Sequence, residues 1–125
     1  MSLDVYLKGP EQTVRCECNN CGNKHGYIDR PDWFEANITH NLGAMADAAG
    51  IYKALWHPEE VGINTAADLI EPLEKGLALM RADRQKFEAF NAKNGWGLYE
   101  NFVPWIERYL AACKEYPTAG VEVSR

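Results

Sequence analysis

The stretch Leu3-Asp4-Val5-Tyr6-Leu7 alternates apolar and polar side chains and sets the plan for the rest of the chain. Successive side chains of a β-strand point to opposite faces, so Leu3, Val5 and Leu7 share one face. The alternation predicts a half-buried strand, which Gly9-Pro10 ends. Because a lone strand is not stable, we expect partner strands elsewhere in the sequence.

Four further segments have the character of short strands. Residues 13–18 alternate in the same way, residues 27–29 are expected to return as their hairpin partner, and residues 33–37 are expected to be extended. Residues 121–124 alternate valine with polar side chains at the end of the chain. We expect this last strand to pair either with the first strand or with residues 33–37.

Between residue 37 and the last strand the apolar period becomes that of a helix. Residues 38–49 carry apolar side chains at helical spacing, with Thr39 as the expected N-cap and Gly50 as the residue after the helix end. Residues 51–57 are expected to form a short second helix, which ends before Pro58.

Two longer helices are predicted over residues 65–82 and 98–116, and each carries a broad apolar stripe that must be buried. The order of strands, then helices, then one strand predicts an α+β fold. We expect a small antiparallel sheet, formed by the N-terminal strands and the C-terminal strand, with a helical layer on one face. Residues 1–125 are expected to form one domain, with residues 13–30 as an inserted metal-binding hairpin, a zinc knuckle.

The metal-binding hairpin is predicted from the stretch Cys16-Glu17-Cys18-Asn19-Asn20-Cys21-Gly22-Asn23-Lys24-His25. Thiolates and an imidazole at this spacing suit zinc, and a structural zinc site fills all four positions with protein atoms. We predict that one structural Zn²⁺ is held by Cys16, Cys18, Cys21 and His25. Four ligands within ten residues is a compact arrangement, so His40 is the alternative fourth ligand. The competing interpretation is free thiols or a disulfide.

Composition limits the class of protein. Apolar residues make up 46% of the 125 residues, enough for a core, and the longest uncharged apolar run is far short of a transmembrane span. The net charge of −5 argues against a broad electrostatic contact with nucleic acid. A cytoplasmic protein is expected, with no membrane partner. A nucleic-acid binder that uses the zinc knuckle stays a secondary alternative.

Polar and aromatic side chains near the predicted helix starts form the candidate binding surface. Asn37, His40 and Asn41 would cluster by i, i+3 and i+4 spacing if residue 37 lies close to the first helical turn. Tyr52 and Trp56 are i, i+4 partners on the next short helix, and aromatic side chains with polar tips are common at binding sites. The competing interpretation assigns the first group to helix capping and the second to the edge of the core.

Catalytic signatures are absent from the sequence. It contains no glycine-rich phosphate loop, no Gly-x-Ser-x-Gly elbow and no His-Glu-x-x-His helix. This absence favours a binding protein over an enzyme. A small hydrolase or transferase that uses His40 as its base remains the alternative, because catalytic groups can come together from distant positions.

Several stretches occur together in this chain: Met1-Ser-Leu-Asp-Val-Tyr-Leu7, Ala36-Asn-Ile-Thr-His-Asn-Leu42, Ala49-Gly-Ile-Tyr52, Leu55-Trp-His-Pro-Glu-Glu60, Asn94-Gly-Trp-Gly97 and Val121-Glu-Val-Ser-Arg125. Together they resemble a family of small uncharacterised phage, prophage and bacterial proteins. The likeness implies an accessory protein that acts in the host cytoplasm on host machinery or host defence. Its expected target is a host protein or a small signalling molecule, engaged without catalysis.

Overall fold

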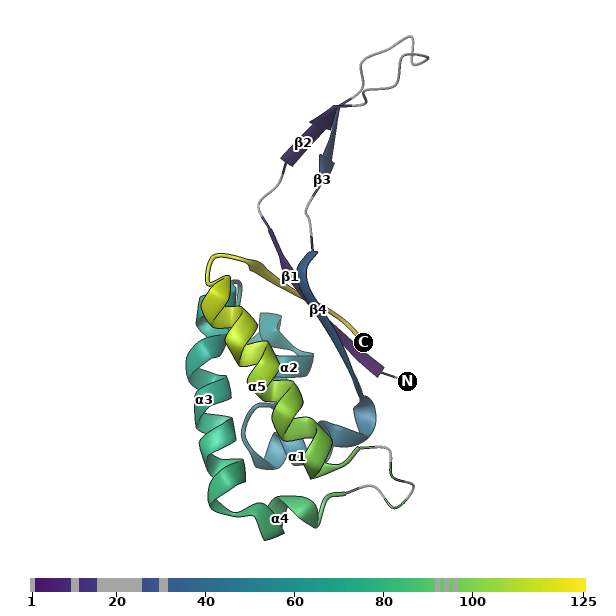
Figure 1. The fold of residues 1–125 in the computed structure, drawn as a ribbon, viewed down its shortest axis with the longest axis vertical. Helices are drawn as coiled ribbons and strands as arrows, with labels where there is room; N and C mark the ends of the chain where they lie inside the picture. Colours follow the sequence, from purple (N-terminus) through teal and green to yellow (C-terminus); the bar gives the residue numbers. More distant parts are fainter. Residues whose placement is uncertain are drawn as a thin grey trace.

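The computed structural model of the protein describes residues 2–9, 12–15, 26–29, 32–91, 93, 95 and 97–125, with only the backbone for 12–15 and 26–29 (Figure 1). It confirms a small α+β fold. A three-stranded antiparallel sheet carries several helices on one side, and two further strands form a separate two-stranded sheet.

Strand β1 (Ser2–Lys8) is the centre of the larger sheet. It pairs antiparallel with β4 (Asp32–Thr39) on one edge and with β5 (Gly120–Ser124) on the other. Val5, for example, lies opposite Ala36 of β4 and Val123 of β5. The apolar side chains of β1 are fully buried and alternate with partly exposed ones, as the sequence predicts. Of the two pairings predicted for the C-terminal strand, the structure has the one with the first strand.

Strands β2 (Gln12–Arg15) and β3 (Gly26–Asp29) pair antiparallel, with Gln12 opposite Asp29 and Arg15 opposite Gly26. This pairing confirms the predicted hairpin partners. The predicted metal ligands between the two strands lie outside the described residues, and so does the end of the strand predicted over residues 13–18.

The segment after β4 differs from the sequence prediction. A helix was expected from residue 38, but β4 continues through Thr39 because the register pairs Leu3 with Ile38 and Ser2 with Thr39. Ile38 therefore enters the core from a strand. Thr39 still acts as a cap for the next turn, since its Oγ1 accepts a hydrogen bond of 3.3 Å from the Asn41 amide. Gly50 has the positive φ of 76° expected of a residue that ends a helix.

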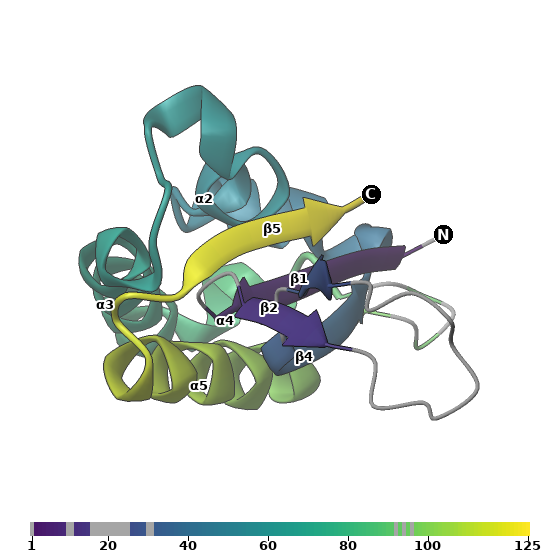
Figure 2. The same cartoon turned by 90° about the horizontal axis from the view of Figure 1, so that it is seen from above.

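The helical layer consists of short elements followed by two long helices. The helices are α1 (Gly43–Ala48), α2 (Tyr52–Trp56), α3 (Ala66–Ala82), α4 (Arg84–Glu88) and α5 (Tyr99–Glu115), with 3₁₀ turns η1 (His40–Leu42) and η2 (Pro58–Val61). Within the described residues, no helix is long and apolar enough to span a membrane. Figure 2 shows α2 on the β5 side of this layer and α5 on the β4 side.

Helices α3 and α5 pack together, as their apolar stripes predict. Ion pairs between Arg81 and Glu107 and between Lys114 and Glu74 join their exposed edges. Helix α3 begins with a capping box, in which Asp68 accepts hydrogen bonds from the backbone amides of Asn64 and Thr65. These amide donors hold the pKa of the Asp68 carboxyl below its usual value.

Strand β5 is also tied to the start of α3. The Ala66 amide donates to the Ala119 carbonyl over 2.9 Å, and the Val121 amide donates to the Asn64 carbonyl over 3.1 Å. The last strand therefore joins the central strand on one side and the helical layer on the other.

We predict that deleting residues 121–125 destabilises the whole domain. The deletion removes most of the β5 ladder and two half-buried valines, and we expect a fall of at least about 10 °C in the melting temperature. Circular dichroism melting measures it. Ser124→Ala is the control, because it leaves the backbone ladder in place. A truncated protein that melts at the temperature of the full chain would contradict this role for β5.

Cys113 is a fully buried free thiol on the inner face of α5, where it is part of the core. Burial raises its pKa to about 12. Tyr109, one turn earlier, is also fully buried, and burial raises the pKa of its phenol as well. Both groups therefore stay protonated in the folded protein under ordinary conditions.

The folded protein should protect Cys113 from alkylation. Iodoacetamide attacks the thiolate, so we expect no modification of this residue at pH 8.5 in the native state and rapid modification in guanidinium. Peptide mass spectrometry of the alkylated protein measures the modification. Equal modification in both states would show that this part of α5 is open.

The pKa of Cys113 in the folded protein lies above that of an exposed thiol. The free energy of unfolding should therefore fall as the pH rises past the pKa of an exposed thiol.

Candidate functional site

Three of the five predicted binding residues meet at the corner between β4 and α2. The indole Nε1 of Trp56 donates a hydrogen bond of 2.9 Å to Nδ1 of His40, which stands in η1 directly after β4. Tyr52 stacks on Trp56 with ring centroids 5.2 Å apart and planes inclined by 22°. The i, i+4 spacing on α2 creates this stack, and the end of β4 brings the histidine to it.

The hydrogen bond from Trp56 fixes the tautomer of His40. An indole nitrogen can only donate, so Nδ1 of His40 must carry a lone pair and accept. In a neutral ring the proton is then on Nε2. The structure shows no hydrogen-bond partner for that Nε2–H within the described part of the chain. The free edge of His40 is therefore a hydrogen-bond donor.

These side chains line a pocket of about 540 Å³, which we call the His40 pocket. Its lining residues are His40, Gly43, Ala44, Asp47, Tyr52 and Trp56. The two small residues of α1 leave the space open, and Asp47 supplies a carboxylate with no partner in the described structure. Trp56 is 2% exposed and forms the base, whereas Tyr52 is partly exposed. The pocket therefore offers one donor, one acceptor and an aromatic wall.

A second pocket, of about 570 Å³, shares Asp47 and Tyr52 with the first. Its other walls come from α2, the η2 segment and the first turns of α3, including Ala54, Ile63 and Pro72. Apolar surface is the larger part of its lining. Tyr52 therefore stands between two pockets of similar volume.

The two asparagines of the predicted binding surface, Asn37 and Asn41, do not line the His40 pocket. Asn37 is on β4, so the expected helical spacing to His40 does not exist, and its Nδ2 donates to Asp4 Oδ1 over 2.6 Å. Asn41 is exposed in η1, and its backbone amide serves the Thr39 cap. The strand pairing of β4 with β1 causes this difference. A role of Asn37 or Asn41 in binding stays a prediction.

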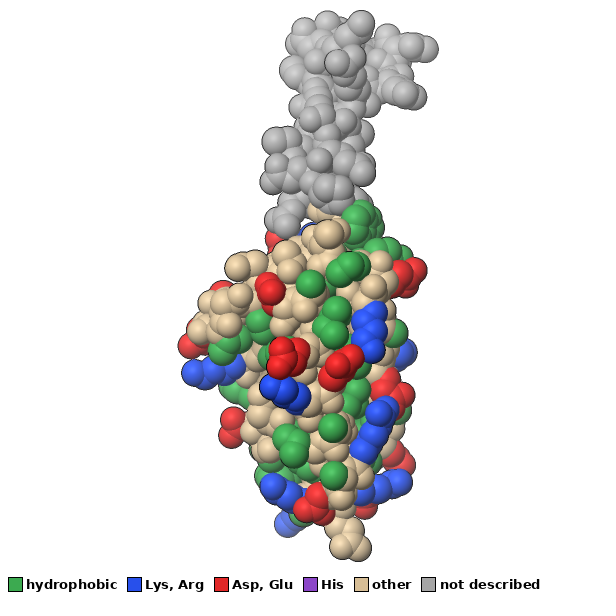
Figure 3. All heavy atoms as spheres, turned by 90° about the vertical axis from the view of Figure 1, so that its left-hand side faces the viewer, with side chains coloured by type: hydrophobic (Ala, Val, Ile, Leu, Met, Phe, Trp, Pro, Cys, Tyr) green, Lys and Arg blue, Asp and Glu red, His purple; other side chains and the backbone are tan. Residues whose placement is uncertain are grey.

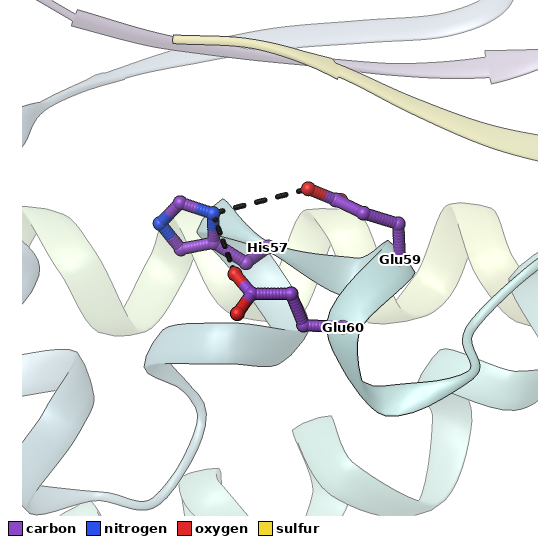
Figure 4. A group of neighbouring side chains, drawn as sticks. All are labelled: His57, Glu59 and Glu60. Atoms are coloured by element: carbon purple, nitrogen blue, oxygen red, sulfur yellow. Dashed lines mark ion pairs between the residues drawn. The ribbon is translucent and has the colours of Figure 1, made fainter.

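Sequence reasoning missed a charged cluster at the turn between α2 and η2 (Figure 4). Nδ1 of His57 lies 3.0 Å from Glu60 Oε2 and 3.9 Å from Glu59 Oε1. Arg125 completes the group, because its Nη1 lies 2.8 Å from each of the Trp56 carbonyl oxygen, His57 Nδ1 and Glu59 Oε1. The only sequence signal was the carboxylate pair next to a histidine. Arg125 arrives through the pairing of β5.

Potential metal ligands meet at this cluster, since one atom each of His57, Glu59 and Glu60 lies within 4.8 Å of the others. The guanidinium of Arg125 already supplies the positive charge there, and it holds the pKa of Glu59 below its usual value. A divalent cation would have to displace it. The geometry therefore favours an ion-paired connection between β5 and α2, which we call the Arg125 cluster, over a metal centre.

The predicted zinc ligands Cys16, Cys18, Cys21 and His25 lie outside the described residues. His40, the alternative fourth ligand, already uses Nδ1 for Trp56. In the described part of the chain it belongs to no group of three potential ligands; the one such group is the Arg125 cluster histidine with its two glutamates. Zinc binding therefore stays a prediction from the sequence.

No protein-family model, no curated protein and no solved structure matches this chain.

Zinc binding can be measured directly. We expect one equivalent of zinc by elemental analysis of protein purified without added metal, and its loss in Cys18→Ser and Cys21→Ser. Cys113→Ala should keep the zinc, since this buried thiol is part of the core. Less than about a tenth of an equivalent, with all thiols of the knuckle reacting freely, would contradict a structural zinc site.

Proposed function

We propose that the protein is a non-enzymatic binding protein that holds a small molecule in the His40 pocket. The observation that carries this proposal is the hydrogen bond from Trp56 to His40, which leaves a donor and no lone pair on the open edge of the ring. The family resemblance adds the context: an accessory protein of phage or prophage type that acts in the host cytoplasm on a signalling molecule. The zinc knuckle is a separate structural element in this proposal.

The same hydrogen bond argues against the hydrolase or transferase alternative. A general base needs an unprotonated nitrogen within reach of the substrate. Nδ1 of His40 faces Trp56, and Nε2 carries the proton in this tautomer. The other residues that line the pocket include no serine, threonine, cysteine or lysine that could act as a nucleophile. Asp47 is exposed, which suits a binding carboxylate better than an activated one.

The described surface favours a small molecule over a host protein as the ligand. The His40 pocket has a volume within the usual range for small-molecule sites. The large apolar side chains that are exposed, Trp33, Val61, Leu79 and Phe90, come from four separate segments. On the face drawn in Figure 3, apolar side chains are interspersed with acidic and basic ones. On that face, the described residues form no contiguous apolar patch of the kind that marks a typical protein interface.

The lining of the His40 pocket defines the ligand by its chemistry. Nε2–H of His40 needs an acceptor such as a carbonyl or an oxyanion, and the Asp47 carboxylate needs a donor such as an amino or hydroxyl group. The Tyr52 ring offers a face for a planar group. A small polar molecule with a flat ring and both kinds of hydrogen-bonding group fits these three features.

We predict that filling the pocket abolishes binding. Ala44→Leu places a larger side chain in the pocket, and leucine has a high helix propensity, so α1 should stay folded. His40→Phe keeps a ring but removes the Nε2–H donor. Ligand-observed NMR with a small-molecule extract of host cells detects the ligand. We expect at least about a tenfold loss of affinity in both variants. Ala111→Leu is the matched control, because it adds the same group at an exposed site on α5.

Two results would contradict the proposal. Ligands that bind the Ala44→Leu variant as tightly as the parent protein would place the site elsewhere. Turnover of a nucleotide or an ester by the purified protein, lost in His40→Phe and kept in Ala111→Leu, would establish the enzyme alternative. A host protein captured in place of any small molecule, with capture lost in Ala44→Leu, would keep the site and change the class of ligand.

A further inference from the structure

A separate pocket of about 390 Å³ lies between the end of β4 and one face of α5. We propose that it is an oxyanion site, which takes the carboxylate or phosphate group of a small ligand with Arg108 as the charged contact. This pocket shares no lining residue with the His40 pocket, and the proposal does not rest on the proposed function.

The side chains that line this pocket carry a net positive charge. Arg108 is the only ionisable residue among the described ones that line the pocket. The other polar contributions are the amides of Asn37 and Asn101, the hydroxyl of Thr39 and the indole of Trp105. The protein as a whole is acidic, but this pocket is lined by an arginine and by no carboxylate. It therefore favours a negatively charged ligand over a cation.

The guanidinium group of Arg108 is available to a ligand. Four other cations of α3, α4 and α5 are each paired with a carboxylate: Lys75 with Glu71, Arg81 with Glu107, Arg84 with Glu88, and Lys114 with Glu74. The side chain of Arg108 has no hydrogen bond or ion pair within the described structure. Its guanidinium therefore keeps its full set of donors, in a planar fork that matches two oxygens of a carboxylate or phosphate.

Trp105 provides an independent observation. Its side chain is 3% exposed, it lines the pocket, and its Nε1 is buried without a hydrogen-bond partner among the described residues. Buried N–H groups are normally satisfied, so an unpaired one next to a pocket suggests a missing acceptor. Asn101, Trp105 and Arg108 are spaced i, i+4 and i+7 and so lie along one face of α5. An oxyanion seated there faces the donor side chains of this helix.

The size and charge of the site limit the class of ligand. One arginine neutralises about one negative charge, and no second basic side chain among the described residues lines the pocket. A nucleic acid needs several such contacts, which the net charge of −5 also opposes. Asn37 already donates to Asp4, whose carboxylate lies outside the lining, so a ligand must avoid that side. A small group with one or two negative charges, such as a carboxylate or a phosphomonoester, meets these limits better than a polyanion.

The test is an NMR titration of the full-length protein with inorganic phosphate and, separately, with acetate. Sodium chloride at matched ionic strength is the reference. We expect saturable shifts of the Trp105 indole N–H and the Arg108 side-chain N–H signals with at least one oxyanion, at a dissociation constant on the order of 1 mM. Phosphate alone would define a phosphate site, and acetate alone a carboxylate site.

Arg108→Gln should weaken the binding at least fivefold. Lys86→Gln is the matched control, because it removes the same charge from an exposed residue of α4 outside the pocket. The amide spectrum of each variant shows whether it is folded. Unsaturated shifts that sodium chloride reproduces would overturn the proposal, and so would equal affinity in the Arg108→Gln protein. Ala44→Leu, which fills the other pocket, should leave this titration unchanged, so failure of one site is distinguishable from failure of the other.

Discussion

The structure depends on the antiparallel pairing of β1 with strands from both halves of the chain. β1 has β4 on one edge and β5 on the other, and its buried side chains form the floor on which the helices pack. The β4 pairing ends at Thr39 and so sets where His40 stands. The β5 pairing carries Arg125 to the carbonyl of Trp56, the partner of that histidine. Both sides of the His40 pocket therefore depend on the register of one sheet.

Local signals in the sequence were sufficient where a single element determines the outcome. Alternation located β1 and β5, and the apolar stripes located α3 and α5. The sequence failed at Ile38, which fits the helical period of the residues after it and equally the inward face of a strand. Its pairing with Leu3, 35 positions away, decides for the strand. The helical period of apolar residues reports only local spacing, so it contains no information on a contact between residues 35 positions apart.

The candidate site divides along the same line. The stack of Tyr52 on Trp56 follows from i, i+4 spacing and was predictable. The hydrogen bond to His40 spans 16 positions, the one from Asn37 to Asp4 spans 33, and the contact of Arg125 with His57 spans 68. Each of these needs the strand register first. Nδ1 of His57 can accept from Arg125 or donate to Glu60, but not both, so the contact that holds β5 and the contact within η2 compete for one atom.

The two proposed sites present donors to their ligands although the protein carries a net charge of −5. The long-range field of such a protein opposes the approach of an anion, but at physiological ionic strength it is screened beyond about 8 Å. Inside that distance, Nε2–H of His40 and the guanidinium of Arg108 act on the ligand with little competition, although Asp47 also lines the first pocket. Selection at both sites is therefore local, and the acidic surface mainly limits the affinity for large polyanions.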